Sequence, residues 1–116
     1  MAEFLISYKK TNINEGGFVD DPSDSGGMTY SGISRVNFPH WEGWKEIDEL
    51  KEKVSNFPAC LKLSEDLPQM IEKFYKENFW NKINGDEIPS QELANDIYDA
   101  SVNMGVHAAL ELLKIS

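Results

Sequence analysis

One glutamate, Glu15, stands directly before a pair of glycines, at the end of a segment that we expect to be the first helix. A carboxyl group at the C-terminal end of a helix meets the negative end of the helix dipole, which disfavours its charged form. Removal of water would raise the pKa of that carboxyl further. A carboxylic acid that stays protonated near neutral pH is what a glycosidase requires, together with a second group opposite. The pattern therefore predicts a general acid at Glu15.

The ordinary interpretation of an isolated glutamate in such a place is a solvated side chain at a helix end. The following pair, Gly16 and Gly17, favours the chemical interpretation, because glycines let the backbone turn sharply and leave room for a ligand. Asp20, Asp21 and Asp24 come next, and such aspartates more often stabilise loops than perform chemistry.

A calcium-binding EF-hand is the natural rival for this aspartate-rich stretch. Counted from Asp20 or from Asp21, the position of its bidentate glutamate falls on Ser31 or on Gly32. Neither residue offers a carboxylate, so an EF-hand is excluded, while a looser cation site stays open as an alternative. With one cysteine and two histidines a zinc site is not expected either. We predict no metal and no cofactor.

Apolar residues recur at helical spacing along most of the chain and predict a mainly α-helical protein. Residues 16–32 instead have the composition of an irregular loop or a small β-hairpin. We expect Ser90 to cap one helix at its N-terminus and Gly105 to end it. The predicted helices span residues 2–14, 41–54, 65–82, 90–104 and 106–115.

The composition limits the class of protein. A length of 116 residues with 41% hydrophobic residues fits one domain with a modest core. The 11 basic and 20 acidic residues give a net charge of −9, which argues against nucleic acid as a partner. It also fits poorly with adhesion to an anionic cell wall. Cys60 has no partner for an internal disulfide and is expected to be a packed side chain.

No apolar run approaches the length of a membrane helix, about 18 residues, so we predict no membrane insertion. The N-terminus lacks the basic lead, sustained apolar stretch and cleavage site of a signal peptide. We therefore expect synthesis in the cytoplasm, with any action outside it following export by another route or lysis.

Aromatic side chains allow two interpretations, because sugars stack on aromatic faces. Periodic aromatic residues are better explained as core, whereas Tyr30, inside the polar loop, is the aromatic residue that we expect to contact a substrate. Asn103 is interpreted either as a site residue or as a buried amide that braces the loop. The periodic residues assigned to the core are Phe74, Tyr75 and Phe79. Both interpretations stay open for Trp41 and Trp80, and Trp44 is expected in the buried stripe of the helix over residues 41–54.

Several motifs of this chain, taken together, resemble glycoside hydrolase family 108. The resemblance covers nearly the whole chain, in order and at compatible spacing. Glu-Gly-Gly alone is a weak signal, whereas the full series is fairly specific. The motifs are Asn14-Glu15-Gly16-Gly17-Phe18, Asp20-Asp21-Pro22, Asp24-Ser25-Gly26-Gly27, Thr29-Tyr30-Ser31-Gly32-Ile33-Ser34, the run from Phe74 to Trp80 and the run from Leu93 to Gly105.

The family comprises N-acetylmuramidases that are also labelled putative secretion activator proteins. The resemblance implies a lysozyme-like α-helical fold with a small irregular β-hairpin or loop lobe. It also implies hydrolysis of the β-1,4 bond between N-acetylmuramic acid and N-acetylglucosamine in peptidoglycan. The family's catalytic glutamate carries over to Glu15, in agreement with the argument from the helix end.

The resemblance implies less specific roles for the remaining site residues. Asp24, with Asp20 next, is the candidate for a second carboxylate that activates water or steadies the developing cation. Thr29 is the alternative holder of that water. Asp20, Tyr30 and Asn103 are predicted to line or shape the substrate site.

Residues 1–116 are predicted to form one muramidase domain, and the C-terminal peptidoglycan-binding domain that usually follows in the family is not seen. We favour a monomer with peptidoglycan as the partner. A lysozyme-like protein that binds wall glycan without cleaving it, or a secretion-associated factor, remains an alternative. Only the enzyme would release reducing ends from purified wall.

Overall fold

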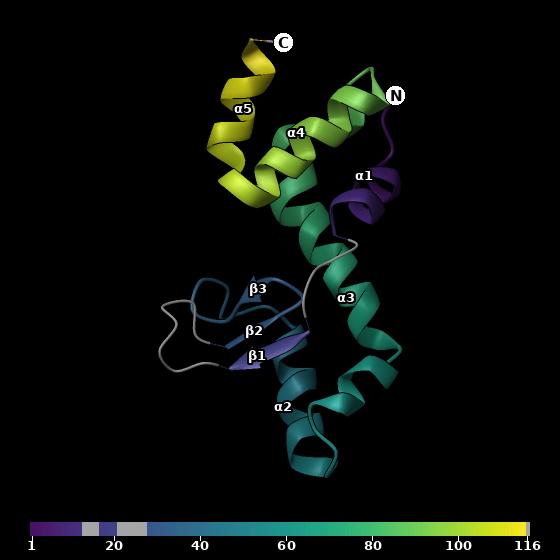
Figure 1. The fold of residues 1–116 in the computed structure, drawn as a ribbon, viewed down its shortest axis with the longest axis vertical. Helices are drawn as coiled ribbons and strands as arrows, with labels where there is room; N and C mark the ends of the chain where they lie inside the picture. The colour runs from purple at the N-terminus through teal and green to yellow at the C-terminus, as the bar shows by residue number, and fades with distance from the viewer. Residues whose placement is uncertain (13–16, 21–27, 116) are drawn as a thin grey trace. The chain divides into compact units, whose positions relative to one another are not determined.

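The computed structural model describes residues 1–12, 17–20 and 28–115 (Figure 1). The chain divides into two compact units, one of Met1–Asn14 with Glu72–Ser116 and one of Glu15–Ile71. The predicted fold class, a mainly α-helical lysozyme-like protein with a small β lobe, is confirmed. That residues 1–116 form one muramidase domain stays a prediction. No helix in the described part of the chain is both long and apolar enough to cross a membrane.

The unit of Glu15–Ile71 contains a small antiparallel sheet in the order β1-β2-β3. Its strands are β1 (Phe18–Asp20), β2 (Met28–Tyr30) and β3 (Ile33–Ser34). Helix α2 (Gly43–Lys53), the 3₁₀ turn η1 (Ala59–Leu63) and the start of α3 (Asp66–Tyr75) follow. The predicted hairpin is thus confirmed, and β3 adds a strand that the sequence interpretation did not contain.

A two-residue turn joins β2 to β3. Ser31 and Gly32 both have positive φ, 50° and 82°. Two positive φ angles are characteristic of the tight turns whose twist matches that of the strands beside them, and glycine adopts them without steric cost. The Ser-Gly step between Tyr30 and Ile33 therefore has a structural role: it fixes the register of β2 and β3.

The other unit is helical. It holds α1 (Phe4–Thr11), the end of α3, α4 (Gln91–Met104) and α5 (Val106–Lys114). The predicted cap of α4 is confirmed, because the Ser90 hydroxyl accepts the backbone N–H of Leu93 at 3.2 Å. Gly105 ends α4 with φ 98°, a conformation that side chains rarely allow.

Three aromatic rings form the centre of the helical unit. Phe4, Trp80 and Tyr98 contact one another edge to face, with centroids 5.7 to 6.0 Å apart. Trp80 and Tyr98 are completely buried. Such aromatic pairs stabilise a fold by more than the burial of their surface area alone. This triangle joins α1, the π-type turn η2 (Lys76–Trp80) and α4.

A polar seam joins α1 to α4. The buried Ser7 hydroxyl donates to Asn95 Oδ1 at 2.6 Å, and Gln91 Nε2 donates to both Ser7 Oγ and Asn95 Oδ1. One helical turn further along, Thr11 Oγ1 donates to Asp99 at 3.2 Å. The seam satisfies polar groups that would otherwise be buried without partners.

Three predictions on the helices need correction. The predicted first helix, residues 2–14, is shorter as described, because α1 ends at Thr11. The spacing of Phe4, Leu5 and Tyr8 predicts that all three lie on one apolar face of this helix, but Leu5 is 49% exposed, since α1 meets α4 partly through the polar seam. Met104 continues the apolar spacing of Leu93 and Ile97, which predicts that it is buried, but it is 60% exposed, because α4 ends there and the chain turns at Gly105.

The long helix predicted for residues 65–82 is helical from Asp66 onward but changes its winding. The α-helical part ends at Tyr75, and the π-type turn η2 and the 3₁₀ turn η3 (Asn81–Ile83) continue it. The change brings Trp80 into the core, where its indole Nε1–H donates to Asp86 at 2.8 Å. Of the two interpretations left open for Trp80, the structure shows the core one, and the expected burial of Trp44 and Cys60 is confirmed.

Candidate active site

The hairpin carries three of the predicted site residues, and its register separates them. Thr29 lies opposite Val19 and Ser34, whereas Tyr30 lies opposite Phe18 and Ile33. Directly opposed residues share a face of a sheet, and successive residues alternate between faces. Thr29 therefore lies on one face of the sheet, and Tyr30 on the other.

Asp20 pairs with Met28, so it belongs to the same face as Tyr30. This face holds the buried Ile33 and contacts the rest of its unit, for example through Phe18 against Phe57 at 5.0 Å. Asp20 itself is exposed, and Tyr30 is half-buried. Burial raises the pKa of the Tyr30 phenol, which keeps its proton at neutral pH and can donate a hydrogen bond.

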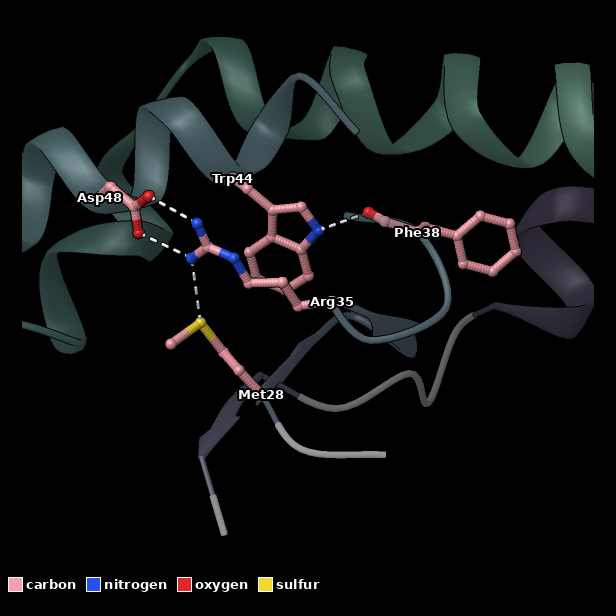
Figure 2. A network of polar contacts seen from close by, with 5 residues as sticks. All are labelled: Met28, Arg35, Phe38, Trp44 and Asp48. Atoms are coloured by element: carbon pink, nitrogen blue, oxygen red, sulfur yellow. Dashed lines mark hydrogen bonds and ion pairs between the residues drawn. The ribbon is translucent and has the colours of Figure 1, made fainter. Parts of the chain in front are cut away.

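Arg35 connects the hairpin to α2 (Figure 2). Its guanidinium donates two parallel hydrogen bonds to Asp48, at 2.8 and 2.7 Å. One of the same nitrogens donates to Met28 Sδ at 3.4 Å, and the backbone N–H of Arg35 donates to the carbonyl of Met28 at 2.9 Å. The strand with Thr29 and Tyr30 is thereby held on the helix by backbone and side chain together.

Trp44 completes this network. The Arg35 guanidinium lies 5.2 Å from the centroid of the Trp44 ring, in cation–π contact. The indole Nε1–H of Trp44 donates to the carbonyl of Phe38 at 2.9 Å, which fixes the loop between β3 and α2 (Figure 2). We did not predict this network from the sequence. The available signal was that Arg35 is the only arginine in the chain, and arginine is the residue suited to planar, two-point recognition of a carboxylate.

The Arg35–Asp48 pair predicts a dependence of stability on pH. The hydrogen bonds from Arg35, and then its charge, lower the pKa of Asp48 in the folded protein. The pair therefore stabilises the fold fully above the unfolded pKa of about 4, and the contribution is lost as the pH falls through the folded pKa. We expect Asp48→Asn to reduce the free energy of unfolding at pH 7 by no more than about 1 kcal/mol, because solvent screens this half-exposed pair.

Urea unfolding of the wild type and of Asp48→Asn at pH 7 and near pH 2 measures this effect. The difference between the two proteins should shrink at the lower pH. A difference that is the same at both pH values would contradict the assignment. Asp66→Asn, at an exposed carboxylate in the first turn of α3, serves as the control.

Glu15 and Asp24 lie outside the described residues. The described helix α1 ends at Thr11, with Asn12 as its C-cap, four positions before Glu15 in the sequence. A helix dipole acts within the last turn, so the described helix does not supply the placement on which the dipole argument for Glu15 depended. The assignment of Glu15 is thus supported by its motif rather than by this argument.

Asn103 belongs to the helical unit, near the end of α4. Its side chain is exposed, and its amide donates to the carbonyl of Asp99 in the preceding turn at 2.9 Å. The alternative interpretation of Asn103 as a buried amide bracing the loop is therefore wrong. Its role as a substrate contact stays a prediction. Among residues 1–12, 17–20 and 28–115, no group of carboxylates, histidines and thiols is arranged to hold a metal ion.

Taken together, the fold and the hairpin define a mainly α-helical lysozyme-like protein, a class to which glycoside hydrolases belong. The family model described as Glycosyl hydrolase 108 matches residues 8–105. The chain therefore belongs to glycoside hydrolase family 108, as its motifs had indicated.

A solved structure supports the same assignment. The chain is similar to the protein in "Structure of Brucella abortus SagA", with 31% sequence identity and a TM-score of 0.59. The similarity covers 96% of this chain and 56% of that one, so this chain spans about half the length of its relative. No curated protein matches the chain.

Proposed function

We propose that this protein is a peptidoglycan N-acetylmuramidase, which hydrolyses the β-1,4 bond between N-acetylmuramic acid and N-acetylglucosamine. The observation that carries the proposal is the family match over residues 8–105, which includes Glu15 and every other predicted site residue. The family consists of glycoside hydrolases. The proposal adds which glycosidic bond is cleaved, which polymer contains it and which residues carry out the reaction.

In the proposed reaction Glu15 donates its proton to the glycosidic oxygen while the bond from that oxygen to the anomeric carbon breaks. The sugar passes through a transition state that resembles an oxocarbenium ion, and water completes the hydrolysis. A second group must activate this water or stabilise the cation. Asp24 is our first candidate for the carboxylate version of this role, followed by Asp20.

Thr29 is the candidate for a hydroxyl version, in which its side chain holds the attacking water. The register of the hairpin makes the two sets of candidates distinguishable. A sugar lying along one face of the sheet meets Thr29, whereas one lying along the other face meets Asp20 and Tyr30. The exposure of Val19 beside Thr29, 48%, favours the face of Thr29 for a ligand.

We expect Thr29→Val to lower kcat about tenfold, the effect of removing one hydrogen bond to the reacting water. Valine has nearly the shape of threonine, and both are strand-forming residues, so the sheet should be retained. Tyr30→Phe is the matched variant on the opposite face and should leave kcat within about twofold. Initial rates of reducing-end release from purified peptidoglycan measure both. Equal losses in the two variants would contradict this division of the sheet.

The proposed partner is the peptidoglycan glycan strand, which the protein would meet after export or lysis, acting as a monomer. The net charge of −9 predicts that encounter with an anionic wall is slow at low salt and faster as salt screens the repulsion. A non-catalytic glycan-binding or secretion-associated role is the competing hypothesis.

Digestion of purified peptidoglycan decides between these hypotheses. For the enzyme we expect a loss of turbidity and muropeptides whose reducing ends are N-acetylmuramic acid, identified by mass spectrometry after borohydride reduction. Products that end in N-acetylglucosamine would contradict the proposed bond. A protein that sediments with the wall and leaves it turbid would instead support the binding role.

A further inference from the structure

Arg35, the loop before α2 and one face of that helix line an open hollow of about 460 Å³ in the unit of Glu15–Ile71. Its floor includes Arg35, Asp48 and Trp44, the network drawn in Figure 2. Its wall includes Trp41, and exposed polar side chains complete the lining. The exposed charged residues of the lining, Glu42, Lys45, Glu49 and Glu52, form its rim.

From this hollow we infer a second carbohydrate subsite, which binds an uncharged N-acetylated hexosamine of the glycan strand; the inference rests on the proposed function. Small-ligand sites are concave and combine aromatic surface with a few fixed polar groups. This hollow has both, on residues that none of the predicted catalytic assignments uses.

The aromatic wall is held in place. The Trp41 and Trp44 rings meet edge to face, with centroids 5.3 Å apart and planes at 89°. The Trp41 ring also lies directly over Gly43, where an added Cβ would come within 2.3 Å of it. Trp41 remains half-buried rather than buried, in contrast to Trp44. A fixed ring that is partly accessible presents a surface on which a pyranose can stack at little cost in entropy.

The polar floor is fixed as well. Both oxygens of Asp48 accept from Arg35, and the pair still keeps substantial exposure, with relative side-chain areas of 34% for Arg35 and 47% for Asp48. Two planar charged groups that are already bonded to each other offer remaining donors and acceptors to hydroxyl and acetamido groups, without a large change in position on binding.

The charge of the rim selects among sugars. Among the described residues of the lining, the exposed carboxylates of Glu42, Glu49 and Glu52 face the single exposed cation Lys45, and the charges of Arg35 and Asp48 balance each other, so the lining is negative overall. Acidic side chains accept hydrogen bonds from hydroxyl groups but repel another carboxylate. The lactyl carboxylate of N-acetylmuramic acid is therefore disfavoured here, and N-acetylglucosamine is favoured. Subsites that prefer different sugars would help to set the register in which the glycan strand binds to the protein.

The experiment uses ¹⁵N-labelled Glu15→Gln protein, so that turnover cannot deplete the ligand, and the uncharged trimer of N-acetylglucosamine as the probe. We expect saturable shifts at the Trp41 indole N–H and at the backbone amides of residues 40–52. Shifts confined to the hairpin residues 28–34 would place the trimer in the catalytic site alone and overturn the inference.

Three variants test whether the trimer binds in the hollow. Trp41→Ala should weaken binding about tenfold, through loss of the stacking surface. Because Trp41 also packs on Trp44, we pair it with Glu52→Gln, which changes one exposed acceptor of the rim and should weaken binding by a smaller factor. Glu46→Gln, on the same helix but not lining this hollow, should bind as the parent does. Unchanged binding in both Trp41→Ala and Glu52→Gln would overturn the subsite.

Two further outcomes are informative. Nα-acetyllysine amide is the cationic probe. Its saturable binding in the hollow, without binding of the trimer, would indicate a cationic ligand instead of a sugar and overturn the inference. Because binding is measured without turnover, its failure is separate from failure of the proposed function. Wild-type protein that releases reducing ends while the hollow stays silent would contradict the subsite alone.

Discussion

Replacement of Glu15 by glutamine is expected to lower the release of reducing ends from peptidoglycan by about 10²- to 10⁴-fold, the range that general acid catalysis contributes. Glutamine keeps the size and hydrogen-bonding capacity of the side chain but has no proton to give to the leaving oxygen. The loss should appear in kcat, with affinity for the wall little changed. Turbidity assays give the rate, and co-sedimentation with wall gives the binding.

Glu87→Gln is the matched control, because it makes the same chemical change at an exposed residue of the 3₁₀ turn η4 (Gly85–Glu87). It should retain the parental rate. Thermal unfolding of both variants should match the wild type, so that a lost rate cannot be attributed to a lost fold. Activity retained in Glu15→Gln would contradict the assignment of the acid, and Asp24→Asn would then be the next variant to examine.

Truncation of Trp80 to alanine is expected to be the most damaging change to the stability of the helical unit. The ring is completely buried between Phe4 and Tyr98, and removing a buried tryptophan costs about 3–5 kcal/mol through lost transfer energy and the cavity left behind. The variant also leaves Asp86 without the indole donor. Denaturant unfolding followed by circular dichroism measures the loss.

Two milder variants separate these contributions. Asp86→Asn keeps an oxygen that can accept from the indole and should cost less than about 1 kcal/mol. Gly85→Ala places a methyl group where the Trp80 ring lies, since its Cβ would come within 2.2 Å of the ring, and should also destabilise the unit. A loss below about 1 kcal/mol in Trp80→Ala would contradict the central role assigned to this ring.

The sequence determined the elements of this protein whose causes are local. The N-cap at Ser90 and the end of a helix at Gly105 each depend on the chemistry of one residue and its neighbours in the chain. Apolar spacing placed the helices, and turn residues placed the hairpin. The ordered motifs around Glu15, Tyr30 and Asn103 also sufficed to identify the family, because they are properties of the sequence itself.

Tertiary structure alone decided which residues meet. The pairing of Arg35 with Asp48, the separation of Thr29 from Tyr30 by the sheet, and the exposure of Leu5 depend on strand register and on helix contacts. A shift of register by one residue would exchange the two faces of the sheet without changing any local preference. Helix periodicity likewise marks an apolar residue but not whether another element covers it. Such contacts join residues that are far apart in the chain and depend on the energy of the whole fold. The local sequence pattern therefore does not predict them.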